Sequence, residues 1–406
     1  MLHCGLLGET LGHSYSPMIH HELASYEYRL FEVPKAQLDG FLTSGGWDGL
    51  NVTIPYKKAV VPYCTELSEA AERLQSVNTI VRRRDGTLYG DNTDLYGFLY
   101  MVRRSGIDPA GKKALVLGSG GASVTVKAAL EQLGAHVTVI SRSGPDNYEN
   151  LDRHADARII ANTTPVGMYP RNGAAAVDLR QFPDCEGVLD IVYNPARTAL
   201  LLQAEQLCIP HAGGLSMLVA QAKRSSEQFS GAVIDDSALE RVERTVNSHL
   251  RDIILIGMPG SGKSTVAAAL GKALGREVVE ADTLIAEQAG MSIPEIFAQQ
   301  GEAGFRRLET DVLAEQGKRS GIILSTGGGC VTRPENYPLL HQNGTIFRLT
   351  RDLAKLPTEG RPISQTTDLA QLCARREPLY RRFADVTVSN DGALEVTVQT
   401  IKEALL

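Results

Sequence analysis

Short apolar runs alternate with longer amphipathic or alanine-rich stretches along most of the chain. Seven of these runs are five to seven residues long, are rich in Val, Ile and Leu, and lie at 114–118, 136–141, 158–164, 187–193, 252–257, 321–326 and 344–350. Runs that are apolar throughout are typical of strands buried on both faces of a parallel sheet. The stretches between them have the length of crossover helices, so the pattern predicts an α/β fold built on parallel sheets.

The same pattern indicates where the chain divides. Its 406 residues exceed a usual single core, so we expect two or three domains. Residues 237–251 are charged with helical spacing, and a new apolar strand follows at once, which places the main boundary near residue 248. A softer boundary lies near residue 103, before the strand at 114–118.

The composition argues against a nucleic-acid-binding protein, a structural zinc site and a membrane protein. Hydrophobic residues make up 43% of the chain and charged residues 22%, and the net charge is −6, so no basic surplus indicates a nucleic-acid partner. The six cysteines form no C-x-x-C pair, which favours reduced thiols over a structural zinc site. No apolar run reaches the roughly 18 residues of a membrane span, and the N-terminus turns polar within eight residues. We therefore expect a cytoplasmic protein without a membrane or nucleic-acid partner; the sequence does not predict its oligomeric state.

A glycine-rich loop follows the strand at 114–118. The segment VLGSGGAS places Gly118 and Gly120 between that strand and a helix expected to start near Ala122, with Ser123 where a third glycine is common. Such a turn lets a pyrophosphate approach the backbone at the helix N-terminus, although the same turn also occurs without a ligand. Because a strand, a loop, a helix and a second strand follow in order, we favour a dinucleotide site.

The residues after the second strand of this unit indicate which dinucleotide. An NAD site usually offers Asp or Glu there to the ribose hydroxyls, whereas this chain has Ser141, Arg142 and Ser143. A guanidinium suits a 2′-phosphate, so Arg142 favours NADP over NAD. A solvated surface arginine is the alternative for this residue taken alone.

Polar stretches precede the glycine-rich loop. In HSYSPMIHHEL, Ser16 fits a helix N-cap with Pro17 at the first helical position, which leaves Ser14 unexplained. In NVTIPYKK, Lys57 stands just past a strand end, and Asp94 closes a segment with the pattern of a hairpin. Singly, such residues are more often turn formers or solvated charges. Together, beside a nicotinamide site, they suit carbonyl reduction of a polyhydroxylated substrate, because an ammonium can protonate the developing oxyanion while a carboxylate orients it.

A second nucleotide loop lies in the last part of the chain. GMPGSGKST, at 257–265, fits G-x-x-x-x-G-K-[ST] completely, between an apolar strand and an alanine-rich helix. Backbone amides of 260–264 would bind phosphates, Lys263 would neutralise the outer ones, and Ser264 would ligate Mg²⁺. The motif is specific for phosphate binding but does not identify the acceptor.

Charged residues beyond this loop supply the rest of a phosphoryl-transfer site. The strand at 321–326 ends in Ser and Thr, so the carboxylate for the metal is expected from Glu280 or Asp282, after the apolar run EVV. Arginines later in the chain suit clamps for an anionic acceptor or a mobile cover for the transferred group: Arg306, Arg361 and Arg376. Surface charge is the alternative, and we accept it for Arg307, Arg375, Arg381 and Arg382.

Eight ordered motifs over residues 1–235 carry a family resemblance: HSYSP, NVTIPYK, SVNT, GDNTD, LGSGGAS, NTTPVGM, DIVYNP and GGLSMLVAQA. Together they resemble shikimate dehydrogenase. The resemblance implies that Lys57 and Asp94 are the catalytic pair. It implies that shikimate is held by Ser14, Ser16, Thr53, Asn78, Asp94, Tyr193 and Gln221. It also implies that NADP is bound by Gly118, Ser119, Gly120, Gly121, Ala122, Arg142, Ser143, Ile191, Gly214 and Met217. The further basic residue that often follows Arg142 in this family is absent.

The C-terminal motifs GMPGSGKST, GEAGFRRLE, TGGGC, EGRP and ARREPLYRRFAD resemble shikimate kinase. The resemblance implies catalytic roles for Lys263, Asp282 and Arg361, with Arg361 in a closing lid. It implies that ATP is bound by Pro259, Gly260, Ser261, Gly262, Lys263, Ser264, Thr265 and Arg361. It implies that shikimate is held by Asp282, Arg306, Gly328 and Arg376. The metal would lie on Ser264 and, through water, on Glu280, which stands where the family usually has the first aspartate of D-x-D.

The two resemblances imply a bifunctional enzyme. We expect an α/β substrate-binding domain over 1–103, to which helices near 213–236 return, a Rossmann NADP-binding domain over 104–236, a helical junction over 237–251, and a P-loop kinase domain with a parallel sheet over 252–406. The first half would reduce 3-dehydroshikimate with NADPH, and the second would phosphorylate shikimate with ATP and Mg²⁺. Two alternatives stay open: a regulatory, non-catalytic P-loop domain, and a quinate-type dehydrogenase that uses NAD.

Overall fold

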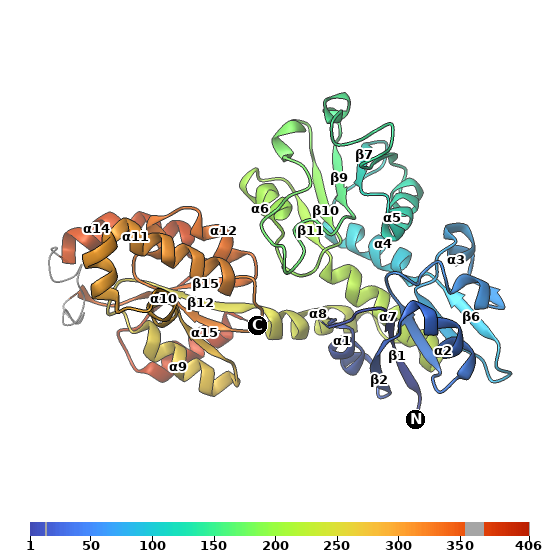
Figure 1. The fold of residues 1–406 in the computed structure, drawn as a ribbon, viewed down its shortest axis with the longest axis horizontal. Helices are drawn as coiled ribbons and strands as arrows, with labels where there is room; N and C mark the ends of the chain where they lie inside the picture. The colour runs from blue at the N-terminus through green and yellow to red at the C-terminus, as the bar shows by residue number, and fades with distance from the viewer. Residues whose placement is uncertain (13, 354–368, 406) are drawn as a thin grey trace. The chain divides into compact units, whose positions relative to one another are not determined.

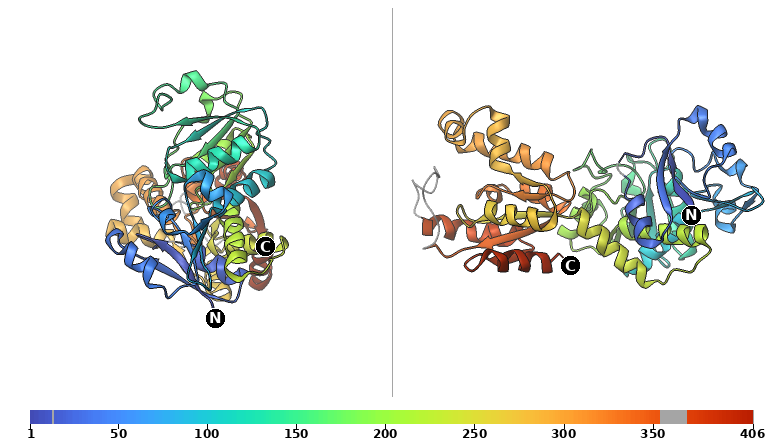
Figure 2. Two further views of the ribbon diagram at one scale, coloured as in Figure 1. Left: turned by 90° about the vertical axis from the view of Figure 1, so that its right-hand side faces the viewer. Right: turned by 90° about the horizontal axis from the view of Figure 1, so that it is seen from below.

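The computed structural model describes residues 1–12, 14–353 and 369–405, and the chain forms two compact units, Met1–Val246 and Asn247–Leu406. Both units have helices packed on parallel or largely parallel strands (Figure 1), so the predicted α/β class is confirmed. Figure 2 shows the same elements from two further sides. Within the described ranges, no helix is both long and apolar enough to cross a membrane.

The N-terminal unit begins with a six-stranded sheet of order β2-β1-β3-β5-β6-β4. Its strands are β1 (His3–Gly8), β2 (Glu27–Glu32), β3 (Gly49–Val52), β4 (Glu66–Leu67), β5 (Thr79–Arg82) and β6 (Leu88–Asp91). β1 runs parallel to β2 and β3, whereas β5 and β6 form the antiparallel hairpin expected from the sequence. The helices around this sheet are α1 (Ser16–Leu23), α2 (Leu38–Ser44), α3 (Glu69–Leu74) and α4 (Thr93–Ser105).

A second sheet in this unit has five parallel strands in the order β11-β10-β9-β7-β8. They are β7 (Lys113–Leu117), β8 (His136–Ile140), β9 (Ile159–Asn162), β10 (Gly187–Asp190) and β11 (His211–Gly213). Two helices, α5 (Gly121–Gln132) and α6 (Ala199–Gln206), lie on opposite sides of this sheet in Figure 1. Alternate residues of β7 therefore enter different cores, with Val116 on the side of α5 and Leu117 on the side of α6.

The long helix α7 (Leu215–Ser230) follows β11 but packs against α4 and α1. The close approach of α4 and α7 depends on Gly97, since a Cβ there would lie 2.6 Å from the carbonyl oxygen of Met217. α7 therefore brings residues from the end of the unit back to the first sheet. The next helix, α8 (Ser237–Leu250), buries Leu239, Val242 and Val246 along one face.

The C-terminal unit contains one fully parallel sheet of order β13-β14-β12-β15-β16. Its strands are β12 (Asp252–Ile256), β13 (Val278–Glu280), β14 (Ile323–Ser325), β15 (Gly344–Thr350) and β16 (Val386–Ser389). Its helices are α9 (Lys263–Leu274), α10 (Ala281–Ala289), α11 (Ile293–Gln316), α12 (Asn336–His341), α14 (Leu369–Phe383) and α15 (Leu394–Glu403). α9 and α15 share one core with the sheet, and α10, α11, α12 and α14 pack on its other face.

One local prediction is wrong. Ser16 is the first residue of α1 rather than its N-cap, and Pro17 is therefore at the second helical position. The amide of Ser16 donates to the hydroxyl oxygen of Ser14 at 3.2 Å. Because Ser14 lies two residues upstream of a free helix amide, its hydroxyl is the one that satisfies the helix start, and Ser16 is left for another role.

Candidate functional sites

The first candidate site contains an ion pair between two of the predicted residues. Lys57, in the loop after β3, donates from Nζ to Oδ2 of Asp94, in the first turn of α4, at 2.6 Å. The side chains are 20% and 14% exposed, so the pair is held by the protein and still reachable by a small ligand. A lysine fixed by a carboxylate in this way can deliver a proton to one defined position.

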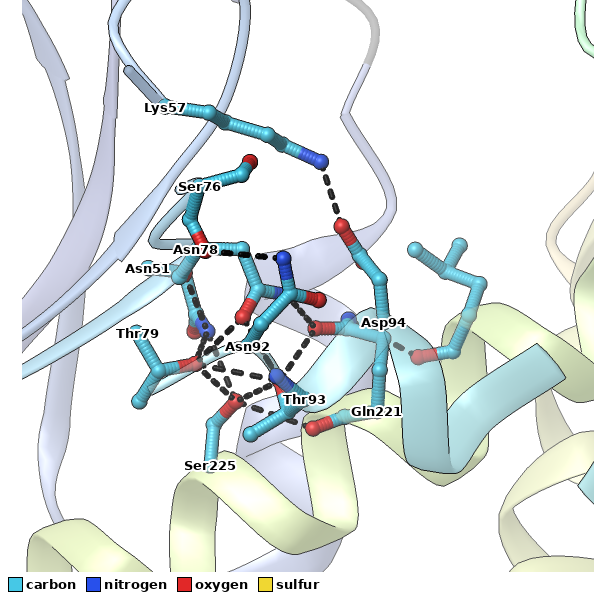
Figure 3. A network of polar contacts seen from close by, with 11 residues as sticks. Asn51, Lys57, Ser76, Asn78, Thr79, Asn92, Thr93, Asp94, Gln221 and Ser225 are labelled. Atoms are coloured by element: carbon cyan, nitrogen blue, oxygen red, sulfur yellow. Dashed lines mark hydrogen bonds and ion pairs between the residues drawn. The ribbon is translucent and has the colours of Figure 1, made fainter. Parts of the chain in front are cut away.

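Two predicted substrate residues lie beneath this pair in a buried polar network (Figure 3). Asn78, which directly precedes β5, is 3% exposed and accepts the amide of Thr93 at 2.7 Å on its Oδ1. Its Nδ2 donates to Oε1 of Gln221, on α7, at 3.4 Å. Four predicted residues from distant parts of the chain, Lys57, Asn78, Asp94 and Gln221, are thus brought together.

The other predicted substrate residues lie on neighbouring segments of the same unit. Thr53 follows β3, and its amide donates to the carbonyl of Leu7 at 2.9 Å. A Cβ on Gly8 would lie 2.8 Å from Cγ2 of Thr53, so the end of β1 packs directly on this threonine. Tyr193, from the loop after β10, contacts Tyr15 just before α1, with ring centroids 5.2 Å apart. Burial, and then the nearby Tyr15, raise the pKa of the Tyr193 hydroxyl, which therefore stays a neutral donor.

The glycine-rich loop contains one glycine that the packing of the protein requires and two that it does not. Gly118 has φ +102, and a Cβ there would lie 2.8 Å from Cγ2 of Thr164, so the fold itself requires glycine at this position. A Cβ on Gly120 or Gly121 would meet no atom within 4 Å. Protein packing does not explain these two glycines, which lie at the exposed N-terminus of α5, where backbone amides can meet a phosphate.

Gly214, by contrast, is explained by packing alone. A Cβ on Gly214 would lie 2.1 Å from the carbonyl oxygen of Ile191, so these two predicted cofactor residues touch through their backbones. Met217 lies one turn later on α7 and is 8% exposed. Ser119, Arg142 and Ser143 are exposed, and Ala122 is partly buried. Arg142 also lies near Tyr148, since burial raises the pKa of that tyrosine while the guanidinium charge lowers it.

A buried carboxylate that the sequence reasoning missed anchors the loop carrying Ile191 and Tyr193. Asp190 is fully buried and accepts the amide of Val192 at 3.0 Å and the hydroxyl of Thr198 at 2.7 Å. Burial raises its pKa to about 6, against hydrogen bonds that lower it. The chain after β10 is therefore held at both ends of the loop by one side chain.

The phosphate-binding loop forms the start of the second candidate site. Gly260 and Gly262 have φ of +90 and +93, and α9 begins at Lys263. The ammonium of Lys263 donates to the carbonyls of Gly257 at 3.0 Å and Met258 at 3.2 Å. This geometry holds the lysine across its own loop, next to the helix N-terminus at which a phosphate would bind.

The hydroxyl of Ser264 donates to Oε2 of Glu280 at 3.0 Å. Glu280 is the last residue of β13, so the carboxyl end of this strand meets the start of α9. Thr265 is exposed beside Ser264, and Ser261 is fully buried. Asn390, which the sequence reasoning missed, donates to the carbonyl of Ser261 at 2.8 Å and thereby fixes the loop from β16.

The predicted acceptor residues gather around the backbone of 327–329. A Cβ on Gly328 would lie 2.7 Å from the ring of Pro259, so this segment lies against the phosphate loop. The carbonyl of Gly328 accepts from Nη1 of Arg376 at 3.1 Å. A Cβ on Gly327 would lie 3.0 Å from Oδ1 of Asp282. Asp282 and Arg376 are therefore neighbours of the same three glycines.

Arg306 completes this cluster through a partner that the sequence reasoning did not single out. Its Nη1 donates to Oε2 of the fully buried Glu309 at 2.7 Å. Burial raises the pKa of Glu309, Arg306 lowers it, Asp282 raises it and Arg376 lowers it. The three charged residues of the predicted acceptor site thus lie within electrostatic reach of one carboxylate. The i, i+3 spacing in FRRLE was the signal that could have found it.

Arg361 lies outside the described residues, and so does the rest of the predicted lid, KLPTEGRP at 355–362. Other polar residues of the first site were not singled out, because the motifs that contain three of them, NVTIPYK, SVNT and GDNTD, do not show that their side chains meet. Hydroxyl and amide groups of this kind in the first site are Asn51, Thr79, Thr93 and Ser225. They come from β3, β5, α4 and α7, so their meeting depends on the tertiary fold.

Comparison with known proteins identifies relatives of both units. Residues 6–80 match the family model of the shikimate dehydrogenase substrate binding domain, and residues 259–406 match that of shikimate kinase. A curated shikimate dehydrogenase (NADP(+)) of Clostridium perfringens (strain SM101 / Type A) is 35% identical over 260 residues, which cover 59% of this chain and 96% of the relative. Both resemblances inferred from the sequence are thereby confirmed.

Solved structures extend the comparison to the fold. The crystal structure of shikimate dehydrogenase 1 from Peptoclostridium difficile aligns with a TM-score of 0.57 and 35% identity, over 61% of this chain and 98% of that one. A quinate dehydrogenase from Corynebacterium glutamicum, in complex with NAD, aligns with a TM-score of 0.56 and 27% identity, over 61% of this chain and 99% of that one.

Proposed function

The chain belongs to the shikimate dehydrogenase family, and from that membership we propose that its N-terminal unit reduces 3-dehydroshikimate to shikimate with NADPH. The observation that carries the proposal is the 2.6 Å ion pair of Lys57 and Asp94 beside the amides of Asn78 and Gln221. A proton donor, a carboxylate and fixed amides next to a dinucleotide loop are the parts that carbonyl reduction of a polyhydroxylated acid needs.

In this proposal Lys57 protonates the substrate oxygen that gains negative charge, and Asp94 keeps the ammonium in place. The amides of Asn78 and Gln221 bind the substrate hydroxyls, with Ser14, Ser16, Thr53 and Tyr193 completing the set. Such positioned donors contribute most where charge develops, because the partly buried site strengthens each of them.

NADP fits the exposed loop at Gly120 and Gly121, where the protein leaves space and helix amides. When bound, it supplies the hydride. Arg142 and Ser143 would hold the 2′-phosphate, and the contact of Ile191 with Gly214 would shape the nicotinamide end of the site.

We propose further that the C-terminal unit transfers the ATP γ-phosphoryl group to the 3-hydroxyl of shikimate. The phosphate loop supports ATP binding, and the approach of Asp282, Arg306 and Arg376 to residues 327–329 supports an anionic acceptor beside it. Asp282 would orient the acceptor hydroxyl, the two arginines would grip the carboxylate, and Lys263 would stabilise the transferred charge.

Mg²⁺ fits the oxygen atoms at the end of β13. The hydroxyl of Ser264 and the carboxylate of Glu280 lie 3.0 Å apart, and both are ligand types that this ion prefers. Ser264 would bind the ion directly and Glu280 through water. The ion, when bound, neutralises phosphate charge.

A regulatory P-loop domain without catalysis is the rival for the C-terminal unit. Such a sensor needs the loop, but it does not need acceptor clamps, and the position of Asp282, Arg306 and Arg376 against residues 327–329 favours an enzyme. The test is ADP formation by the full chain with shikimate and ATP, with Lys263→Ala as the matched control. ADP no faster than in the control would exclude the kinase, whereas NADPH oxidation with 3-dehydroshikimate should be equal in both proteins.

A quinate-type enzyme that uses NAD is the rival for the N-terminal unit. Arg142 in place of an acid after β8 favours NADP, as does the cofactor in the name of the relative from Clostridium perfringens. Rates of oxidation of shikimate and quinate, each with NADP and NAD, separate the two. A preference for quinate with NAD would overturn the proposal for this unit.

A further inference from the structure

Three buried amides of the first site have only one possible orientation each. The Oδ1 of Asn78 faces the amide N–H of Thr93, which can only donate. The Nε2 of Gln221 faces the carbonyl of Leu218 at 3.0 Å, which can only accept. The Nδ2 of Asn51 likewise faces the carbonyl of Asn78 at 3.5 Å. Backbone groups thus decide which end of every amide donates.

Three hydroxyls connect these amides in Figure 3, those of Thr79, Thr93 and Ser225, and each has four partners. The Oγ of Ser225 lies 2.8 Å from Nδ2 of Asn51, 2.9 Å from Oγ1 of Thr79 and 3.1 Å from Oγ1 of Thr93. It also donates to the carbonyl of Gln221, four residues earlier on α7, at 2.9 Å. Ser225 is fully buried, so water does not replace any of these bonds.

The protons of this cluster can be counted. The hydroxyl of Ser225 has one hydrogen, which it donates to the carbonyl of Gln221. Ser225 therefore accepts hydrogen bonds from Asn51 and from one threonine. The Oδ1 of Asn78 lies 3.1 Å from the hydroxyl of Thr93 and 3.2 Å from that of Thr79. One threonine can therefore donate to Ser225 while the other donates to Asn78. Loss of Ser225 removes the acceptor that keeps this arrangement ordered.

The ordered arrangement of these hydroxyls affects substrate binding through the second hydrogen on Nδ2 of Asn78. One hydrogen of its Nδ2 goes to Oε1 of Gln221, which leaves the other hydrogen for a substrate oxygen. The backbone amide of Thr93 sets which end of Asn78 donates, and the threonine hydroxyls, which Ser225 orders, fix the position of that donor.

We propose that Ser225 is a positioning residue of the reductase, which acts through Asn78 to orient the donor that binds a substrate oxygen. It touches neither substrate nor cofactor. The inference rests on the proposed function of the N-terminal unit and assigns a role to a residue outside its binding set.

The test is a double-mutant cycle in the full chain with Ser225→Ala, Asn78→Ala and the pair. We expect Ser225→Ala to lower kcat/KM for 3-dehydroshikimate about fivefold, the typical effect of one neutral hydrogen bond, with KM for NADPH unchanged. In the Asn78→Ala background the same change should have no effect, since two residues that act through one contact are not additive.

Ser230→Ala is the matched control, because Ser230 lies on the same helix, donates to the carbonyl four residues earlier at 2.8 Å and is exposed. It should leave kcat/KM unchanged. Thr79→Val, which keeps the side-chain shape and removes a hydroxyl next to Asn78, should reproduce the loss if Ser225→Ala does not fold.

Three results would overturn the proposal. An unchanged kcat/KM in Ser225→Ala or, where that variant does not fold, in Thr79→Val would do so, and so would an equal loss with and without Asn78. Failure of the wild type to oxidise NADPH with 3-dehydroshikimate would instead overturn the proposed function, and this inference with it.

Discussion

The hydroxyl of Ser264 lies 3.0 Å from the Glu280 carboxylate, although the two residues are 16 positions apart on different elements. Ser264 is in the first turn of α9 and Glu280 ends β13. The Glu280 side chain is longer than the aspartate that the shikimate kinase family usually has at this position. It still reaches the serine of the phosphate loop, so its length does not prevent Glu280 and Ser264 from binding one metal ion.

We therefore predict that Glu280→Gln raises the Mg²⁺ concentration needed for half-maximal ADP formation about tenfold or more, since outer ligands commonly contribute that much to metal affinity. The measurement is a Mg²⁺ titration at saturating shikimate and ATP. Glu287→Gln, on the exposed part of α10, is the control and should leave the midpoint unchanged. If the Mg²⁺ midpoint of Glu280→Gln equals that of the wild type, Glu280 does not contribute to metal binding.

Lys57→Ala should lower kcat for reduction by about 10²- to 10⁴-fold, because a positioned acid contributes in that range. The affinity for NADPH, followed by quenching or enhancement of its fluorescence, should stay nearly constant, since the dinucleotide loop is untouched. Lys58→Ala changes the adjacent, exposed lysine and serves as the control. Turnover near the wild-type value in Lys57→Ala would refute the assignment of the proton donor.

Arg142→Ala should lower kcat/KM for NADPH about ten- to a hundredfold while leaving the value for NADH nearly unchanged. The reason is that a charge-assisted bond to the 2′-phosphate is worth about 1.5–3 kcal/mol and has no counterpart in NADH. Arg180→Ala removes an exposed arginine paired with Asp178 and is the control. An equal loss of kcat/KM with NADPH and with NADH would show that Arg142 does not bind the 2′-phosphate.

The layout of the fold followed from the sequence because periodicity and loop chemistry are local. All seven predicted strands exist, with ends that differ by at most three residues, and α5 and α9 begin at the two nucleotide loops. The start of α1 was placed wrongly because two serines, Ser14 and Ser16, both suit a cap, and only the backbone decides which hydroxyl faces a free amide.

The candidate sites were predictable where a motif carries the chemistry and not where the fold alone assembles it. Lys57 and Asp94 were found through motifs, and the structure pairs them. Ser225 and Asn51 contribute to the same region from positions 174 residues apart. Ser225 stands in none of the motifs, and Asn51 begins NVTIPYK but has no local feature that shows its partners. The partners of a buried hydroxyl are a property of packing, which spacing along one chain does not contain.

Asp252 provides a prediction about stability. It begins β12, is 1% exposed and accepts the amide of Ile322 on Oδ1 at 2.9 Å, while its Oδ2 has no hydrogen-bond partner in the described parts of the chain. Burial raises its pKa from 3.8 to about 8. The hydrogen bond from Ile322 and the charges of Arg276 and Arg319 lower the pKa but do not cancel the effect of burial. The neutral acid is thus the form that the folded unit prefers.

The sign of the pH effect follows from this shift. Between pH 4 and pH 8 the folded chain holds a proton on Asp252 that the unfolded chain has released, so stability falls as the pH rises through this window. The slope from one group is at most about 1.4 kcal/mol per pH unit. Below pH 4 both states are protonated, and this contribution no longer changes.

Asp252→Asn should therefore stabilise the C-terminal unit at pH 8 and flatten this part of its pH dependence, because the amide keeps an oxygen for Ile322 and carries no charge. Hydrogen exchange of the β12 and β14 amides, corrected for intrinsic exchange at each pH, measures the effect. Fluorescence of Trp47, the one tryptophan of the chain and buried in the N-terminal unit, follows that unit as an internal control. If wild type and variant lose protection equally between pH 5 and pH 8, Asp252 stays ionised in the folded chain and its burial is compensated by Arg276 and Arg319.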